Sequence, residues 1–158
     1  MDKSAIISEC RKYRYLLRRI WDDKKPMVCF IMLNPSTADS FEDDPTIRRC
    51  IGFAKSWEYG GIYVVNLFAY RATNPKDLLN APDPIGQNNW RYIQQYTSVS
   101  EKIICAWGNH SIVKKISKKF PNYNPPVSKT LFCLGKNSKG DPKHPLYLKK
   151  NLKPILFN

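Results

Sequence analysis

The sequence predicts an α/β fold: a three-layer sandwich in which helices cover both faces of a central, mostly parallel sheet of four or five strands. Four short apolar runs rich in β-branched and aromatic residues alternate with segments whose apolar residues recur at helical spacing. Parallel neighbours need crossover connections and bury both faces of a sheet, and this alternation supplies the helices for them. The length of 158 residues predicts one domain over residues 1–158.

The first half of the chain contains two predicted strands and the helix between them. Residues 27–33 (MVCFIML) form a continuous apolar run typical of a fully buried strand. Asp44 followed by Pro45 is an N-cap with proline in the first turn, which predicts a helix over about residues 45–58. A glycine pair ends this helix, and residues 62–67 (IYVVNL) are the second predicted strand.

The second half begins with a long proline-rich loop over residues 68–89, a length that is usually functional. We expect a helix over 90–99, a strand over 102–107, a basic helix over 111–120 and a strand over 130–134.

The segment KYRYLLRRIW near the N-terminus fits an added edge strand or a helix, and periodicity does not decide between them.

The sequence has no feature typical of a membrane or secreted protein. No apolar run approaches the roughly 20 residues of a membrane-spanning helix, and the N-terminus lacks the apolar core of a signal peptide. We therefore expect a cytoplasmic protein.

The cysteine pattern predicts reduced thiols in the core. The number is odd and there is no C-x-x-C pair, which disfavours a disulfide framework or a metal site. No phosphate-binding or nucleophile-elbow motif occurs either, so no cofactor is expected. The five cysteines are Cys10, Cys29, Cys50, Cys105 and Cys133.

The charge is strongly and unevenly basic. Hydrophobic (42%) and charged (25%) contents are those of a globular protein, which excludes wholesale disorder. The net charge is +13, and residues 101–158 hold 12 basic and 2 acidic groups against 14 and 11 in residues 1–100. This asymmetry favours a polyanionic partner, nucleic acid and DNA above all, or a nucleotide. Lysine used only for solubility is the alternative.

Polar groups follow each of the four predicted strands. Ligands of open α/β sheets bind outside the carboxyl ends of the strands, so these groups are expected to converge on one rim. The groups are residues 34–39, Asn66 with residues 71–73, residues 108–110, and residues 135–145.

The loop after the first strand offers amide, hydroxyl and carboxyl groups. Asn34 precedes a proline that fixes the turn, so the loop positions a water molecule, binds an anion, or is an Asx-turn that caps the strand. Asp39 is crowded by Asp43 and Asp44, which can raise a carboxyl pKa toward a general-base range; Asp44 is more simply the N-cap. The other expected ligand contacts of this loop are Pro35, Ser36 and Thr37.

The second strand carries a buried amide, and arginines lie nearby in the sequence. Asn66 interrupts an apolar run, so it either bonds neighbouring backbone or presents its carboxamide to a ligand such as a base edge. Arg48 and Arg49 suit phosphate through their planar forks, unless they are merely solvated. Arg71 and Thr73 are expected substrate contacts from the long loop.

His144 lies in a lysine-rich loop after the fourth strand. An imidazole there can stabilise a departing anion, with neighbouring lysines adding positive potential, although a lone histidine is usually ordinary surface. Lys136 and Lys139 are expected phosphate contacts, and Gly108 and Lys143 expected substrate contacts. His110 more simply begins a helix.

The chain resembles the DUF1643 family of bacterial and phage proteins of unknown function in three segments: MLNPSTADSFEDDPTIRRCIGFAKSWEYGGIYVVNLFAYRATNPKDL, CAWGNH and LGKNSKGDPKHPLYL. The order of its motifs is also similar to that of the uracil-DNA glycosylase superfamily. That more distant resemblance implies a glycosylase-like fold, with Asn34 or Asp39 for water, Asn66 for base recognition and His144 for the leaving base. The last motif reads His-Pro-Leu rather than the superfamily's usual His-Pro-Ser, and the iron–sulfur cysteines of some branches are missing.

Three functions are consistent with these features. The leading expectation is a glycosylase-like hydrolase acting on a nucleobase or its N-glycosidic bond, in DNA or a nucleotide. The second is a non-catalytic nucleic-acid-binding module that uses its lysines on phosphates and aromatics for stacking. The third is a small-molecule enzyme that binds a nucleotide-like anion.

Overall fold

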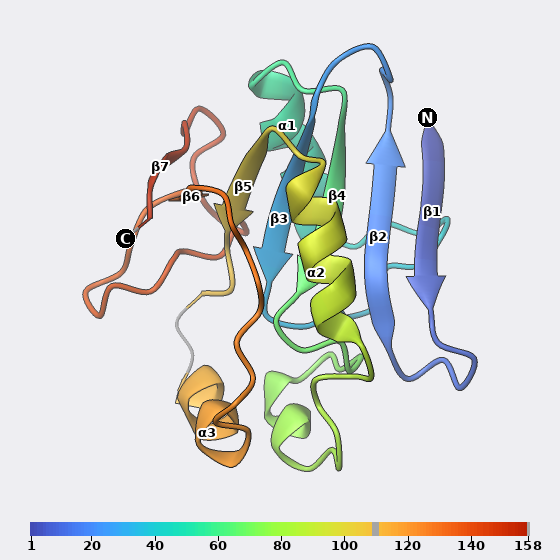
Figure 1. Cartoon of the computed structure of the whole chain (residues 1–158). Coiled ribbons are helices and arrows are strands. Elements are labelled where there is room, and N and C mark those ends of the chain that lie inside the picture. Colours follow the sequence, from blue (N-terminus) through green and yellow to red (C-terminus); the bar gives the residue numbers. More distant parts are fainter. Residues whose placement is uncertain (109–110, 158) are drawn as a thin grey trace.

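A seven-stranded mixed sheet forms the centre of the computed structural model, which describes residues 1–108 and 111–157 (Figure 1). The strand order across the sheet is β1-β2-β4-β3-β5-β6-β7. The strands are β1 (Asp2–Ile7), β2 (Arg14–Ile20), β3 (Met27–Met32), β4 (Gly61–Asn66), β5 (Lys102–Cys105), β6 (Leu131–Cys133) and β7 (Ile155–Leu156). The helices are α1 (Pro45–Ser56), α2 (Asn89–Ser98) and α3 (Ser111–Lys119), with a 3-10 helix, η1 (Pro75–Leu79), in the long loop.

The four inner strands are parallel and the outer ones are not. β3 pairs in parallel with β4 and β5, and β5 with β6, whereas β1, β2 and β7 join antiparallel. The sheet is therefore mixed and has seven strands, not the four or five mostly parallel strands expected. The extra strands arise because the N-terminal segment forms a hairpin, and because a two-residue strand near the C-terminus pairs with β6.

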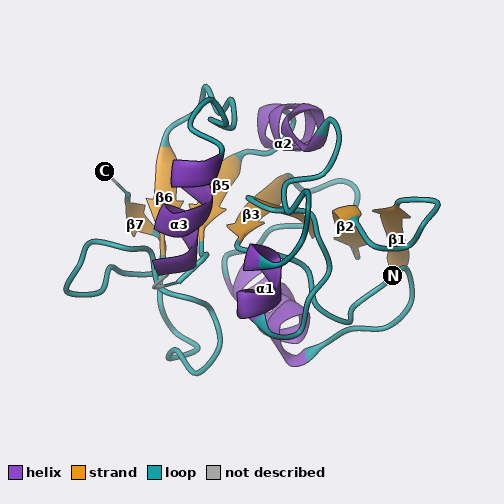
Figure 2. Ribbon diagram, turned by 90° about the horizontal axis from the view of Figure 1, so that it is seen from below, coloured by secondary structure: helices purple, strands orange, loops and turns teal. Residues whose placement is uncertain are grey.

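Helices cover both faces of the sheet, which confirms the α/β class. Successive strand residues point to opposite faces. Val28 and Phe30 pack in one cluster with Phe53 of α1, whereas Cys29 and Ile31 pack in another with Ile93 of α2. Figure 2 shows α1 and α2 on opposite sides of the strands.

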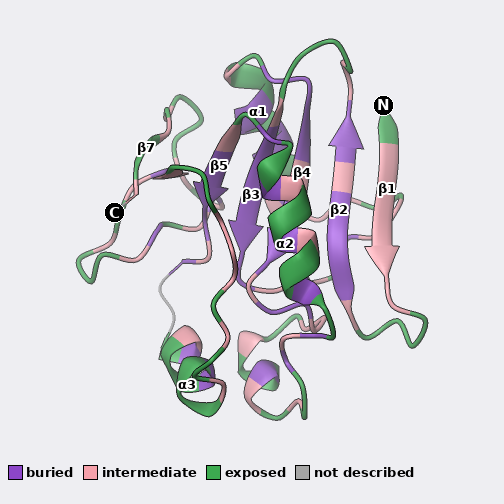
Figure 3. Ribbon diagram, viewed as in Figure 1, coloured by how far each residue is buried: buried purple, intermediate pink, exposed green. Residues whose placement is uncertain are grey.

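The inner strands are the most buried part of the fold. Figure 3 shows β3 and β5 buried along their length and the edge strand β1 half-buried. Each predicted inner strand and helix is confirmed to within a few residues at its ends. The ambiguous segment at residues 12–21 contains strand β2, which lies inside the sheet and not at its edge.

The start of α1 is capped as the sequence predicts. The Asp44 carboxylate accepts a hydrogen bond from the Ile47 amide at 2.8 Å, and Pro45 occupies the first turn. The cap fixes the loop between β3 and α1 at the carboxyl ends of the parallel strands.

All five cysteines are free thiols, and only Cys10 is exposed. Over residues 1–108 and 111–157, no helix has the length and apolar character needed to cross a membrane.

Candidate functional site

A cavity of about 270 Å³ opens at the carboxyl ends of β3 and β4. Asn34, Asn66 and His144 all contribute to its wall, so the fold brings together three side chains that are far apart in the sequence. The other polar side chains of the wall are Arg14, Ser36, Asp44, Thr46 and Thr73, and Trp107 adds an aromatic surface.

Strand alternation places two of these side chains. Ile62 and Val64 of β4 pack in the core against α1, and Asn66 lies two residues further along the same strand. Met32 is paired with Asn66 across the sheet, and Asn34 lies two residues beyond Met32. The cavity is therefore the end of the α1-side core, where apolar side chains give way to amides.

The Asn66 carboxamide is buried and unpaired. Asn66 is 1% exposed, and neither Nδ2 nor Oδ1 has a hydrogen-bond partner among the described residues. Leaving a buried polar group unsatisfied costs roughly 1–3 kcal/mol. Of the two roles the sequence left open for this amide, bonding neighbouring backbone is therefore excluded within the described chain.

Asn34 connects the two loops that border the cavity. Its Nδ2 donates to the carbonyl oxygen of Ala72 at 2.8 Å and to that of Pro35 at 3.0 Å. The Ala72 amide in turn donates to the Pro35 carbonyl oxygen at 2.9 Å. Because the amide nitrogen is used in this way, the side-chain oxygen of Asn34 is the atom left to accept a hydrogen bond from a ligand or water.

The surroundings of Asp39 do not suit the general base that the sequence predicted. Its carboxylate accepts hydrogen bonds from the backbone amides of Glu42 at 2.8 Å and Phe41 at 2.9 Å, and these bonds lower its pKa. The prediction of a raised pKa is therefore wrong, and Asp39 does not line the cavity. The carboxylate that does line it belongs to Asp44.

One ring nitrogen of His144 bonds to the backbone of its own loop. Its Nδ1 accepts a hydrogen bond from the Leu146 amide at 3.1 Å. A neutral imidazole therefore carries its hydrogen on Nε2 and acts as a donor at that atom. The loop that holds it is tied down by the Gly108 amide, which donates to Pro142 at 2.8 Å, and by the Lys143 amide, which donates to Gly135 at 2.9 Å.

Arg14 is the cavity residue that the sequence did not reveal. It is 2% exposed, and its Nη1 donates to the Ala38 carbonyl oxygen at 2.9 Å. Burial lowers the pKa of this guanidinium to about 10, which the negative charge of Asp44 partly opposes. An arginine in the run RYLLRRI looks like a solvated side chain, and the only available signal was its place in a strand otherwise rich in apolar residues.

Several predicted residues lie outside the cavity wall. Gly108 and Lys143 each donate a backbone hydrogen bond within the loops, and Arg71 donates to the Arg11 carbonyl oxygen at 3.4 Å. Asn109 and His110, which the sequence grouped with Gly108, are outside the described residues. The remaining predicted residues absent from the wall are Pro35, Thr37, Arg48, Arg49, Lys136 and Lys139.

Comparison with known proteins identifies a family. A family model described as "Protein of unknown function (DUF1643)" matches residues 14–146. The chain belongs to the DUF1643 family. The matched range contains the whole cavity wall, from Arg14 to Leu146. No curated protein and no solved structure gives a significant match.

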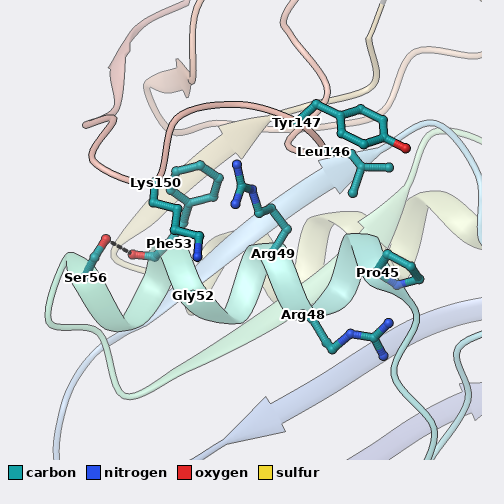
Figure 4. Close-up of a pocket in the computed structure, with 9 residues that line it drawn as sticks. All are labelled: Pro45, Arg48, Arg49, Gly52, Phe53, Ser56, Leu146, Tyr147 and Lys150. Carbon is teal, nitrogen blue, oxygen red and sulfur yellow. Dashed lines mark hydrogen bonds between the residues drawn. The ribbon is translucent and has the colours of Figure 1, made fainter.

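The DUF1643 chain has a second, larger depression of about 690 Å³ along α1 (Figure 4). Arg48, Arg49 and Lys150 contribute positive charge to this α1 groove, and none of its described lining residues is acidic. The Arg49 guanidinium lies 5.5 Å from the centre of the Phe53 ring, and its Nε donates to the Pro145 carbonyl oxygen at 3.3 Å. Figure 4 shows Arg49 extending from α1 toward the C-terminal loop, and Lys150 extending from that loop toward α1.

The C-terminal loop connects the cavity to the α1 groove. Leu146 lines both depressions. The next residue, Tyr147, is 93% exposed and has a φ of 69°, a backbone conformation uncommon for residues other than glycine. The ring of Tyr147 is therefore held in solvent at the edge of the groove, one residue beyond the cavity wall.

The described part of this DUF1643 protein contains no candidate metal-binding cluster. Within the described part of the chain, no group of three or more His, Cys, Asp or Glu side chains is placed to hold an ion. The polar side chains available in the cavity are two amides, three hydroxyls, one carboxylate, one imidazole and one buried guanidinium.

Proposed function

We propose that this chain binds a nucleobase in the cavity and hydrolyses the N-glycosidic bond that attaches it to a sugar. The observation that carries the proposal is the buried, unpaired carboxamide of Asn66 in the wall of that cavity. An amide offers a donor and an acceptor side by side, which matches the adjacent acceptor and donor on the edge of a base.

The size of the cavity favours a base over a whole nucleotide. A volume of about 270 Å³ lies just below the roughly 300–1,000 Å³ of ordinary small-molecule sites. Trp107 supplies an aromatic surface in the same wall. A flat heterocycle that stacks on this ring and bonds to Asn66 fits these dimensions, with its sugar at the mouth.

The remaining polar groups can carry out the hydrolysis. The Asn34 side-chain oxygen can accept a hydrogen bond from a water molecule and orient it, and the Asp44 carboxylate can take the proton of that water. The water oxygen bonds to the sugar C1′ as the C1′–N bond breaks, and the base leaves with the electron pair of that bond. A hydrogen bond from His144 Nε2–H then stabilises the departing base as an anion, and the base takes its proton from solvent.

The α1 groove supports nucleic acid as the carrier of the base. Arg48, Arg49 and Lys150 line it without an opposing acid among the described lining residues, an arrangement suited to phosphates. The exposed ring of Tyr147 lines the groove and directly follows Leu146, which lines both depressions, so this ring can stack on an adjacent base. The predicted phosphate contacts Arg48 and Arg49 thus belong to this surface, whereas Lys136 and Lys139 lie outside it.

The test is base release from defined oligonucleotides. The full chain is incubated with single- and double-stranded DNA that carries uracil, hypoxanthine or a hypermodified pyrimidine, and abasic sites are detected by alkaline cleavage. We expect release of at least one base, and its loss in Asn66→Leu, a variant that removes the amide at similar volume.

The outcomes separate the proposal from its alternatives. Tight binding of DNA without any abasic product means a non-catalytic binding module and contradicts the hydrolase proposal. Release of base from free nucleotides only means a small-molecule enzyme and contradicts the assignment of nucleic acid as the carrier.

A further inference from the structure

Strand β2 contains two buried arginines with opposite hydrogen-bonding states. Arg19 is 0% exposed, and all three of its guanidinium nitrogens have partners: Nε donates to the Asp43 carboxylate at 2.8 Å, and Nη1 and Nη2 donate to backbone carbonyl oxygens. Arg14 is 2% exposed, makes one hydrogen bond, and leaves Nε without a partner among the described residues.

Arg14 makes no ion pair within the described chain, although the negative charge of Asp44 acts on it from a greater distance. A buried cation normally has a paired anion, because the cost of removing a charge from water is otherwise uncompensated. Arg14 lines the same cavity as Asn66, so the two residues with unsatisfied polar atoms belong to the wall of one space.

We infer that Arg14 binds an anionic oxygen group of the ligand that occupies this cavity, a carboxylate or a phosphate. The inference rests on the proposed function, and it adds a requirement to it: the ligand carries a negative charge beside the base edge that Asn66 reads. The planar guanidinium is suited to such a group, because its forked N–H donors match the geometry of two oxygens on one carbon or phosphorus.

Asp44 limits where this group can bind. Its carboxylate is in the same wall and already accepts the Ile47 amide. An anion that approaches Asp44 is repelled, so the anionic group has to lie on the Arg14 side of the cavity.

The experiment measures binding by calorimetry with the full chain, Arg14→Met and Arg14→Lys. The probes are uracil, uracil-6-carboxylate, uridine, uridine 5′-monophosphate and inorganic phosphate. In the unmodified protein we expect an anionic probe to bind about tenfold or more tightly than its neutral counterpart, because a hydrogen bond to a charged group adds that much affinity. The preference is expected to vanish in Arg14→Met and to weaken in Arg14→Lys, which keeps the charge but loses the fork.

The pattern of preference identifies the anion. Tighter binding of the carboxylate than of uracil assigns a carboxylated base, and tighter binding of the monophosphate than of uridine assigns a nucleotide phosphate. Binding of inorganic phosphate that Arg14→Met abolishes supports the site in either case.

The results that overturn the inference differ from those that overturn the proposed function. Uracil and uridine that bind as tightly as the charged probes, or a preference that survives in Arg14→Met, overturn the anion site while base binding stands. Failure of every probe, together with no base release from any oligonucleotide, overturns both. Melting curves check that Arg14→Met is folded.

Discussion

Asn89 holds Asn66 in place from the opposite face of the sheet. The Asn89 Nδ2 donates to the Asn66 carbonyl oxygen at 2.9 Å and to the Leu67 carbonyl oxygen at 3.2 Å. Asn89 begins α2 and is fully buried, whereas the side chain of Asn66 points to the cavity on the α1 side. One asparagine thus fixes the backbone of the other. Among the described residues, Asn89 lacks a partner only at its Oδ1, whereas Asn66 lacks one at both side-chain atoms.

The two asparagines are therefore expected to respond oppositely to the same change. Asn89→Leu removes the side-chain donor of the buried Asn66 carbonyl oxygen, whereas the Leu67 carbonyl oxygen keeps the Tyr123 hydroxyl as a donor. The substitution should lower the free energy of unfolding by about 1–3 kcal/mol. Asn66→Leu removes an unsatisfied amide and should leave that free energy unchanged or raise it. Urea denaturation of both variants measures the difference. Equal destabilisation by the two substitutions would contradict the assignment of Asn66 to ligand binding.

The paired arginine of β2 is predicted to be a structural residue. Arg19→Met leaves the Asp43 carboxylate, which also lies 3.6 Å from the Lys3 ammonium, without its main partner. Removing one member of a buried ion pair costs about 3–5 kcal/mol. Arg14→Met, in the same strand, is the matched control and should cost much less, because no carboxylate of the described chain depends on it. A chemical denaturation series with both variants decides, and an equal loss in the two would count against the distinction.

Local patterns in the sequence were sufficient to predict the inner strands and the helices that cover them. The apolar runs of β3 and β4 and the cap of α1 are each specified by a few adjacent residues, and they formed as predicted. The strands β1 and β7 were missed, because a half-exposed edge strand and a two-residue strand are defined by pairing with distant segments. Position at strand ends was enough to group Asn34, Asn66 and His144.

The missed site residues depended on orientation, which the sequence does not encode locally. Asp39 and Asp44 lie in the same loop, and the turn that hydrogen-bonds the first to backbone decides which of them lines the cavity. Arg14 and Arg19 belong to the same strand. Only the fold shows that Arg19 bonds to the Asp43 carboxylate, whereas Arg14 Nε has no partner among the described residues.

Thiol reactivity should separate Cys10 from the other four cysteines. Its hydrogen bond with Ser8 lowers the Cys10 pKa, and the side chain is exposed. Burial raises the pKa of Cys29 and Cys50, and it raises that of Cys105 to about 12. Since the thiolate is the reactive form, an aromatic disulfide reagent at about pH 8 should modify one thiol quickly in the native protein and all five after unfolding. Rapid loss of two or more native thiols would mean that the core opens readily.

The α1 groove makes a quantitative prediction about salt. Removing one side chain that binds a phosphate reduces the slope of log K against log salt concentration by about 0.7 for a single strand. The double variant Arg48→Ala with Lys150→Ala should therefore reduce that slope by about 1.4. The control is Lys24→Ala with Lys25→Ala, two exposed lysines before β3, at the opposite end of the inner strands. Fluorescence anisotropy with a labelled oligonucleotide measures the slopes, and equal slopes in the two double variants would exclude the groove as the phosphate surface.

Two substitutions at Asp44 separate its role as a cap from its role in the cavity. Asparagine caps a helix about as well as aspartate, so Asp44→Asn should keep the stability of the chain, whereas Asp44→Ala should lower it by about 1 kcal/mol. If the carboxylate takes a proton from the attacking water, both variants lose base release, because neither has a group basic enough to replace it. If Asp44 only caps α1, then Asp44→Asn keeps its activity. Thermal melting together with a single-turnover assay of abasic-site formation distinguishes the two cases, since stability and turnover then change independently in the asparagine variant.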